Sequence, residues 1–182
     1  IKVDTTYTPE IVPVTPTATP AETTDIQGAT QTGKPEFKGG TVTVDGVEKT
    51  VEINESVPAT FDDGSTTKTV DGVGTYTVAA DGTVTFVPEK SFVGTAPAVT
   101  VVREDKNGTK ASATYSPTVL PVTPTATPAE TTDIQGATQT GKPEFKGGTV
   151  TVDGVEKTVE INEDVPATFD DGSTTKTVDG VG

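Results

Sequence analysis

Apolar and polar residues alternate along several short stretches of this chain. Tyr76 and Val78 alternate with threonines, an Ala-Asp-Gly turn follows, and Val84 and Phe86 then alternate with threonine again. A period of two that is interrupted by turn residues is typical of a β-hairpin. The pattern therefore predicts that Tyr76 and Val78 face Val84 and Phe86 across two antiparallel strands.

The same alternation recurs on both sides of this hairpin. Val42 and Val44 precede an Asp-Gly pair at residues 45–46, which is a signal for a tight hairpin turn. A later alternating strand leads into the turn residues 105–108, and a last one ends near Tyr115. Short strands separated by turns predict an all-β fold, an antiparallel Ig-like β-sandwich. We expect a core built from Tyr76, Val78, Val84, Phe86, Val99, Val101 and Tyr115, with Ile26, Phe37, Phe92 and Val93 anchoring the connections.

The whole pattern is copied along the chain with a period of 108 residues. Residues 13–74 and 121–182 are the same sequence except that Ser56 in the first copy is Asp164 in the second. Residues 1–12 also echo residues 109–120. A period of this length is the size of a domain and exceeds the roughly 20–50 residues of a solenoid unit. We therefore expect tandem modules, and we interpret the chain as a window on a longer polypeptide.

Proline and threonine are concentrated where one period passes into the next. Proline fixes φ and pushes the preceding residue to extended conformations, so these stretches predict semi-rigid Pro/Thr-rich connectors. Alternatively, part of each stretch enters the domain as an edge strand, where proline is tolerated. The expected boundaries are a tail of a preceding repeat with the start of a linker at 1–12, a connector at 13–23, a complete sandwich at 24–117, a connector at 118–130, and the N-terminal part of a further repeat at 131–182.

Composition narrows the range of functions. The chain contains no Cys, Met, Trp or His, and its abundant threonine and valine favour strands. Without histidine or cysteine there is neither a His-based nucleophile system nor a thiolate, so we expect no enzyme. The net charge of −14 argues against nucleic acid as a partner. No apolar run approaches the length needed to cross a bilayer, and we expect no membrane insertion.

Several motifs together resemble the CshA-type fibril repeat of cell-wall-anchored streptococcal surface adhesins. They are DIQGATQTGKPEF at 25–37, GTYTV and DGTVTF at 74–86, FVGTA at 92–96, and ATYSPT at 113–118. The resemblance implies a β-sandwich module that stacks in series into a surface fibril, exported and anchored to the wall. It further implies a stalk that projects a distal adhesive domain, with neighbouring repeats as partners and no cofactor or catalytic residue. A module that itself binds a host matrix glycoprotein, or that mediates association between fibrils in a biofilm, is the alternative.

Candidate sites each have a structural alternative. The acidic residues Asp62, Asp63 and Asp105 with Asn107 could contribute oxygen ligands to Ca²⁺, but Asp, Asn and Gly are also what tight turns require. LPVTP at 120–124 approaches a sortase signal, yet its fifth residue is proline and we interpret it as linker. An isopeptide cross-link would join Asn54 or Asn107 to one of the lysines of the unit: Lys34, Lys38, Lys49, Lys68, Lys90, Lys106 or Lys110.

Overall fold

The computed structural model describes all 182 residues, and every regular element in it is a β-strand. The all-β fold class is thus confirmed. No helix in the structure is long and apolar enough to cross a membrane. The chain divides into two compact units, unit 1 at Ile1–Pro121 and unit 2 at Val122–Gly182.

The first sheet of unit 1 has four strands in the order β3-β10-β9-β8. All of its neighbours are antiparallel, and Val84 pairs with Val78 and Phe86 with Tyr76, the register that the alternation predicts. Gly82, in the turn between the two strands, has a φ of 94°, which favours glycine. The strands are β3 (Gln31–Gly33), β8 (Thr67–Val70), β9 (Gly74–Val78) and β10 (Val84–Pro88).

The second sheet of unit 1 is organised around its longest strand, β13. On one side β13 pairs antiparallel with β11 and β12, and β12 pairs with β7. On the other side β13 pairs with β2 in parallel, with Ala21 opposite Tyr115 and Ile26 opposite Leu120. The strands are β2 (Ala21–Ile26), β7 (Thr60–Phe61), β11 (Gly94–Thr95), β12 (Val99–Glu104) and β13 (Lys110–Leu120).

The parallel pair departs from the purely antiparallel sandwich that the sequence predicts. It joins the beginning of the 108-residue period to its end, two segments that no tight turn connects. Because β2 and β13 run in the same direction, the period begins at one end of the sheet and finishes at the other. The Ig-like topology stays a prediction.

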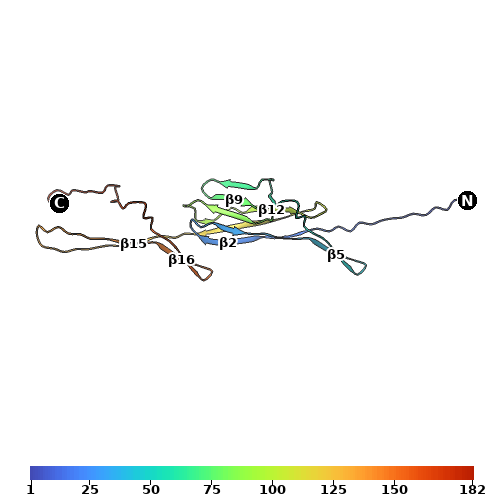
Figure 1. Cartoon of the computed structure of the whole chain (residues 1–182), viewed down its shortest axis with the longest axis horizontal. Coiled ribbons are helices and arrows are strands. Elements are labelled where there is room, and N and C mark those ends of the chain that lie inside the picture. The colour runs from blue at the N-terminus through green and yellow to red at the C-terminus, as the bar shows by residue number, and fades with distance from the viewer. The chain divides into compact units, whose positions relative to one another are not determined.

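The core of unit 1 lies between the two sheets, and all seven predicted core residues are buried in it. Figure 1 shows β9 on one side of unit 1 and β2 on the other. The rings of Tyr76 and Phe86 stack at 4.7 Å between centroids with a tilt of 38°. Further members are Ala59, Phe61, Ala96 and Val119, with Ala21, Phe37, Val70, Val73 and Phe92 packed against them. Ile26 is buried as well, but Val93, expected as an anchor, is largely exposed.

The structure places parts of the predicted connectors inside the domain. Residues 17–23 contribute β1 (Thr17–Thr19) and the start of β2, and residues 118–120 complete β13. Pro20 falls between β1 and β2, where no ladder N–H is lost. Pro117 is fully buried within β13, and its carbonyl accepts a hydrogen bond of 2.9 Å from the N–H of Ala96. Parts of these proline-rich stretches therefore enter the domain as strands, β2 at an edge of the second sheet and the end of β13 between two neighbouring strands.

One hairpin stands apart from both sheets. Strands β5 (Gly40–Val44) and β6 (Val47–Val51) pair only with each other, and in Figure 1 β5 extends away from the sandwich. Asp45 and Gly46 have φ angles of 50° and 77°, as a two-residue type I′ turn requires. The short strand β4 (Glu36–Lys38), which precedes this hairpin, pairs with β1. The Asp-Gly signal is thus confirmed as a hairpin turn, although the hairpin lies outside the core.

Unit 2 contains four strands, each a copy of one in unit 1. Strands β14 (Thr125–Thr127) and β15 (Glu144–Lys146) pair as β1 and β4 do. Strands β16 (Gly148–Val152) and β17 (Val155–Val159) repeat the isolated hairpin, including the positive φ of Asp153.

Candidate functional site

The acidic turn after β7 is held together by its own side chains. Oδ1 of Asp63 accepts hydrogen bonds from the backbone N–H of Ser65 at 2.9 Å and from its Oγ at 2.6 Å. The Ser65 hydroxyl, followed by its backbone N–H, lowers the pKa of the Asp63 carboxyl. Nζ of Lys68 lies 3.3 Å from Oδ1 of Asp62 and 3.8 Å from Oδ2 of Asp63, and 5.7 Å from the centroid of the Phe61 ring. Both carboxylates of this turn are thus within ion-pair distance of Lys68.

Asp105 shapes the turn between β12 and β13. Its Oδ1 accepts hydrogen bonds of 2.9 Å from the backbone N–H groups of Asn107 and Thr109, and its side chain is fully buried. Its N–H also donates to the carbonyl of Thr109 at 2.9 Å, and its backbone bridges to Ile53. Asp105 and Asn107 therefore act within one turn, and the structure gathers no group of three or more possible metal ligands.

Arg103 is a structural residue that the sequence reasoning did not select. It is the only arginine of the chain, and it is buried with Nη2 at 2.9 Å from Oε2 of Glu55 and Nη1 at 3.4 Å from the carbonyl of Asp81. Its inward position could have been predicted from the sequence, because Arg103 continues the alternation of Val99 and Val101 and so lies on the same face of the strand. Its charge argued against burial, and no sequence signal revealed Glu55 as its partner.

Two tyrosines tie distant segments of unit 1 together. The hydroxyls of Thr23 and Tyr115 lie 2.5 Å apart, and Thr23 also donates to Oε1 of Gln31 at 2.6 Å. Nε2 of Gln31 in turn donates to the carbonyl of Thr118 at 2.9 Å. In the other sheet, the hydroxyl of Tyr76 donates to the carbonyl of Pro97 at 2.6 Å. Burial raises the pKa of Tyr76 to about 12 and raises that of Tyr115 as well.

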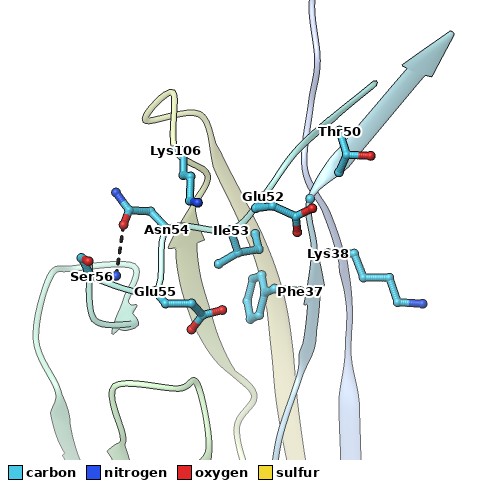
Figure 2. A pocket seen from close by; sticks show the side chains of 10 residues that line it. Phe37, Lys38, Thr50, Glu52, Ile53, Asn54, Glu55, Ser56 and Lys106 are labelled. Atoms are coloured by element: carbon cyan, nitrogen blue, oxygen red, sulfur yellow. Dashed lines mark hydrogen bonds between the residues drawn. The ribbon is translucent and has the colours of Figure 1, made fainter. Parts of the chain in front are cut away.

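An open groove of about 670 Å³ lies where β4, β6 and the following loop meet (Figure 2). Phe37 and Ile53 form its apolar floor, and Glu52, Glu55 and Lys106 are charged residues around it. Three isopeptide candidates, Asn54, Lys38 and Lys106, line this groove, but Oδ1 of Asn54 already accepts the backbone N–H of Ser56 at 3.0 Å. The same bond forms between Asp164 and Asn162 in the second copy, so the one substitution between the copies leaves this turn unchanged.

The seven buried core residues and the tyrosine contacts lie in the interior of unit 1 and link its segments. The family model of the surface adhesin CshA repetitive domain matches residues 13–119 and again residues 121–182. The chain belongs to this family. It consists of tandem repeats of an adhesin, and the family implies an extracellular location at the cell surface.

A solved structure provides a second relative from the same family. The NMR structure of repeat domain 13 of the fibrillar adhesin CshA from Streptococcus gordonii is 61% identical, and the match covers 37% of this chain and 86% of that one. The TM-score of this match is 0.22. A search of curated proteins returned no match.

Proposed function

We propose that this chain is a segment of the stalk of a bacterial fibrillar adhesin, which projects a distal adhesive domain away from the cell wall. In this proposal the repeats bind neither a cofactor nor a substrate and catalyse no reaction. Their partners are the neighbouring repeats of the same polypeptide, and any host glycoprotein is bound by other regions of the full protein. Anchoring to the cell wall belongs to the same proposal.

The parallel pairing of β2 with β13 is the observation that carries this proposal. Because the first and last core strands of the period run in the same direction, each unit receives the chain at one end and releases it at the other. The eleven residues of β13 alone span ~36 Å at the usual rise per residue. A unit of this kind adds length with every copy, whereas one whose first and last strands were antiparallel neighbours would return the chain to its starting side.

The closed core of unit 1 supports the same reading. Every residue of the core cluster and of its packed surroundings falls within residues 21–119, inside a single period. Each copy can therefore fold around its own interior, as a beads-on-a-string stalk requires.

Concatemers test the stalk directly. Proteins with two, three and four copies of residues 13–120 should lengthen by at least ~36 Å per added copy, measured by electron microscopy of single particles. Compact particles, or an increment well below that value, would contradict the proposal. Surface plasmon resonance of the chain over matrix glycoproteins should give no saturable binding, and one-site saturation would favour the alternative.

A further inference from the structure

The turn between β12 and β13 is fixed by a single residue, Asp105. Its Oδ1 accepts hydrogen bonds of 2.9 Å from the N–H groups of Asn107 and Thr109. Its carbonyl accepts a third bond of 2.9 Å from the N–H of Gly108. Gly108 has a φ of 81°, as the last position of a three-residue hairpin loop requires. Three successive backbone N–H groups of this turn are thus bound by Asp105.

The turn is also tied to the loop beside it. The N–H of Lys106 donates to the carbonyl of Glu52 at 2.9 Å, and Asp105 forms a β-bridge with Ile53. The side chain of Asp105 is fully buried, so bulk water does not compete for the bonds that it accepts. The backbone of residues 105–109 is therefore held from within the turn and from the neighbouring loop.

The side-chain amide of Asn107 is left without a partner in this turn. The residue is exposed, and its amide makes no hydrogen bond in the structure. The other two asparagines, Asn54 and Asn162, each accept the N–H of the residue two positions ahead at 3.0 Å. Each of them is also followed by glutamate, whereas Asn107 is followed by glycine. Asn107 thus combines an unbound amide with an unhindered neighbour.

The nearest nucleophile to this amide is the backbone nitrogen of Gly108. A bond between that nitrogen and Cγ of Asn107 closes a succinimide ring, in which the other members are three carbons of Asn107. Glycine has no side chain to crowd this approach, and a Cβ built at Gly108 meets no atom within 4 Å. Lys106 and Lys110 are exposed, and a hydrated ammonium is not a nucleophile. Attack by Gly108 is therefore favoured over the isopeptide cross-link for which Asn107 was a candidate.

We propose that Asn107 is a site of spontaneous covalent modification, and that Asp105 limits its rate. The nitrogen of Gly108 bonds to Cγ of Asn107, its proton passes through solvent to the side-chain nitrogen, and that nitrogen leaves as ammonia. Water then adds to one of the two carbonyl carbons of the succinimide and opens the ring, which leaves aspartate or isoaspartate. The reaction consumes one water, releases one ammonia and needs no enzyme or oxidant. The proposal does not depend on the stalk role.

Asp105 controls this reaction through the position of the Gly108 nitrogen. In the folded turn the N–H of Gly108 donates to the carbonyl of Asp105, and Oδ1 of Asp105 holds the peptide groups on either side. The nitrogen can turn toward Cγ of Asn107 only when these bonds break. Local openings of this kind occur without unfolding of the whole domain. The rate in the folded chain is therefore the rate of the open turn multiplied by the fraction of time for which the turn is open.

Aspartate followed by glycine can close the same ring, but the structure disfavours it at two neighbouring turns. Hydrogen bonds from the hydroxyl and the backbone N–H of Ser65 lower the pKa of Asp63. Those from the backbone N–H and the side chain of Thr83 lower the pKa of Asp81. An ionised carboxylate is a poorer electrophile than an amide, because its charge repels the attacking nitrogen and it offers no neutral leaving group. Asn107 is therefore the preferred site of ring closure.

Either product alters the turn. Aspartate adds one negative charge to a chain whose net charge is already −14. Isoaspartate carries the backbone through its side chain, which inserts one extra carbon between residues 107 and 108. The N–H groups of Gly108 and Thr109 then lose their register with Asp105. The six residue pairs of β12 and β13 lie outside the turn, so modification loosens one end of this hairpin without opening the core.

Ageing of the full chain in mildly alkaline buffer tests the site. Cleavage after glutamate releases residues 105–130, and this fragment should show the mass gain of an amide converted to an acid, divided between two chromatographic peaks. The fragments that contain Asn54 and Asn162 should stay unchanged over the same period. Gly108→Ala should slow the conversion about tenfold or more, because its Cβ crowds the attacking nitrogen. Absence of conversion at Asn107, earlier conversion of another asparagine, or an unchanged rate in Gly108→Ala would overturn the site.

Hydrogen exchange tests the role of Asp105 without any substitution. The factor by which folding slows exchange of the Gly108 amide measures how rarely the turn opens. Folding should slow the modification of Asn107 by the same factor within about threefold, relative to the chain unfolded in urea. A Gly108 amide that exchanges freely while Asn107 is protected, or equal rates of modification in the folded and unfolded chains, would show that Asp105 does not limit the rate.

Three substitutions separate the turn from the rest of the fold. Asp105→Ala removes the Oδ1 acceptor and should speed the modification of Asn107 about fivefold or more. Asp105→Asn retains an oxygen at that position and should stay within about twofold of the parent chain. Phe61→Ala is the matched control, because it weakens the buried core and leaves the turn bonded. Equal acceleration by Phe61→Ala and Asp105→Ala would show that unfolding of unit 1 sets the rate; should Asp105→Ala not fold, the exchange measurement decides.

Discussion

The two copies of one phenylalanine allow a stability prediction with an internal control. Phe61 is completely buried in unit 1, and Phe169, in an identical stretch of sequence, is half exposed. Replacing a buried phenylalanine by alanine removes its transfer free energy and leaves a cavity, at a cost of ~3–5 kcal/mol. A surface substitution changes stability by no more than ~0.5 kcal/mol. Phe61→Ala should therefore be strongly destabilising, and Phe169→Ala nearly neutral.

The tyrosines of the chain provide a spectroscopic signal for the unfolding of unit 1. It has no tryptophan, Tyr76 and Tyr115 are buried in unit 1, and Tyr7 is 86% exposed. The tyrosine band of the near-ultraviolet circular dichroism consequently follows the unfolding of unit 1, because unit 2 contains no tyrosine. For a domain of this size each kcal/mol lowers Tm by ~4–8 °C, so Phe61→Ala should lower Tm by more than about 10 °C. Equal shifts for the two variants, or an unchanged Tm for Phe61→Ala, would refute the core assignment.

Three further outcomes are expected. Gly33→Ala should destabilise unit 1 in thermal melts because its Cβ would meet the ring of Tyr115, whereas Gly141→Ala should leave the melt of unit 1 unchanged. Burial holds the pKa of Tyr76 at about 12, above the ~10 of an unfolded tyrosine, so the folded state binds its proton more tightly. The associated stability is complete below about pH 10 and declines toward pH 12, which urea titrations across that range would reveal. EDTA or added Ca²⁺ should not move Tm, because Lys68 holds the carboxylate of Asp62; a calcium-dependent rise would contradict the turn assignment.

The sequence predicted local pairing better than distant pairing. The β9–β10 register followed from alternation, and the turn at residues 45–46 followed from its Asp-Gly pair, because neighbouring residues decide both. The pairing of β2 with β13 joins segments almost a period apart through backbone groups, which side-chain patterns do not encode. The proline and threonine content of these segments is typical of a linker, and it therefore did not indicate their pairing.

Burial was harder to predict than strand formation. Val42 and Val44 alternate as core residues do, yet their hairpin lies outside both sheets, since alternation defines two faces but not what covers either one. Conversely, Arg103 and Asp105 are charged residues that the fold buries. The burial of Arg103 depends on partners from the other half of the period, such as Glu55, so it becomes visible only with the fold. The side chain of Asp105 is instead bound by N–H groups of its own turn.

The parallel β2–β13 pair also determines how a unit responds to tension. When the two ends of a period are pulled apart, these strands are driven to slide past one another along their length. The six residue pairs from Ala21–Tyr115 to Ile26–Leu120 then share the load and must break together, whereas a hairpin peels open one pair at a time. In the proposed stalk, a unit pulled at its two ends would therefore keep its folded length until these pairs break, and would then lengthen by one unfolded period.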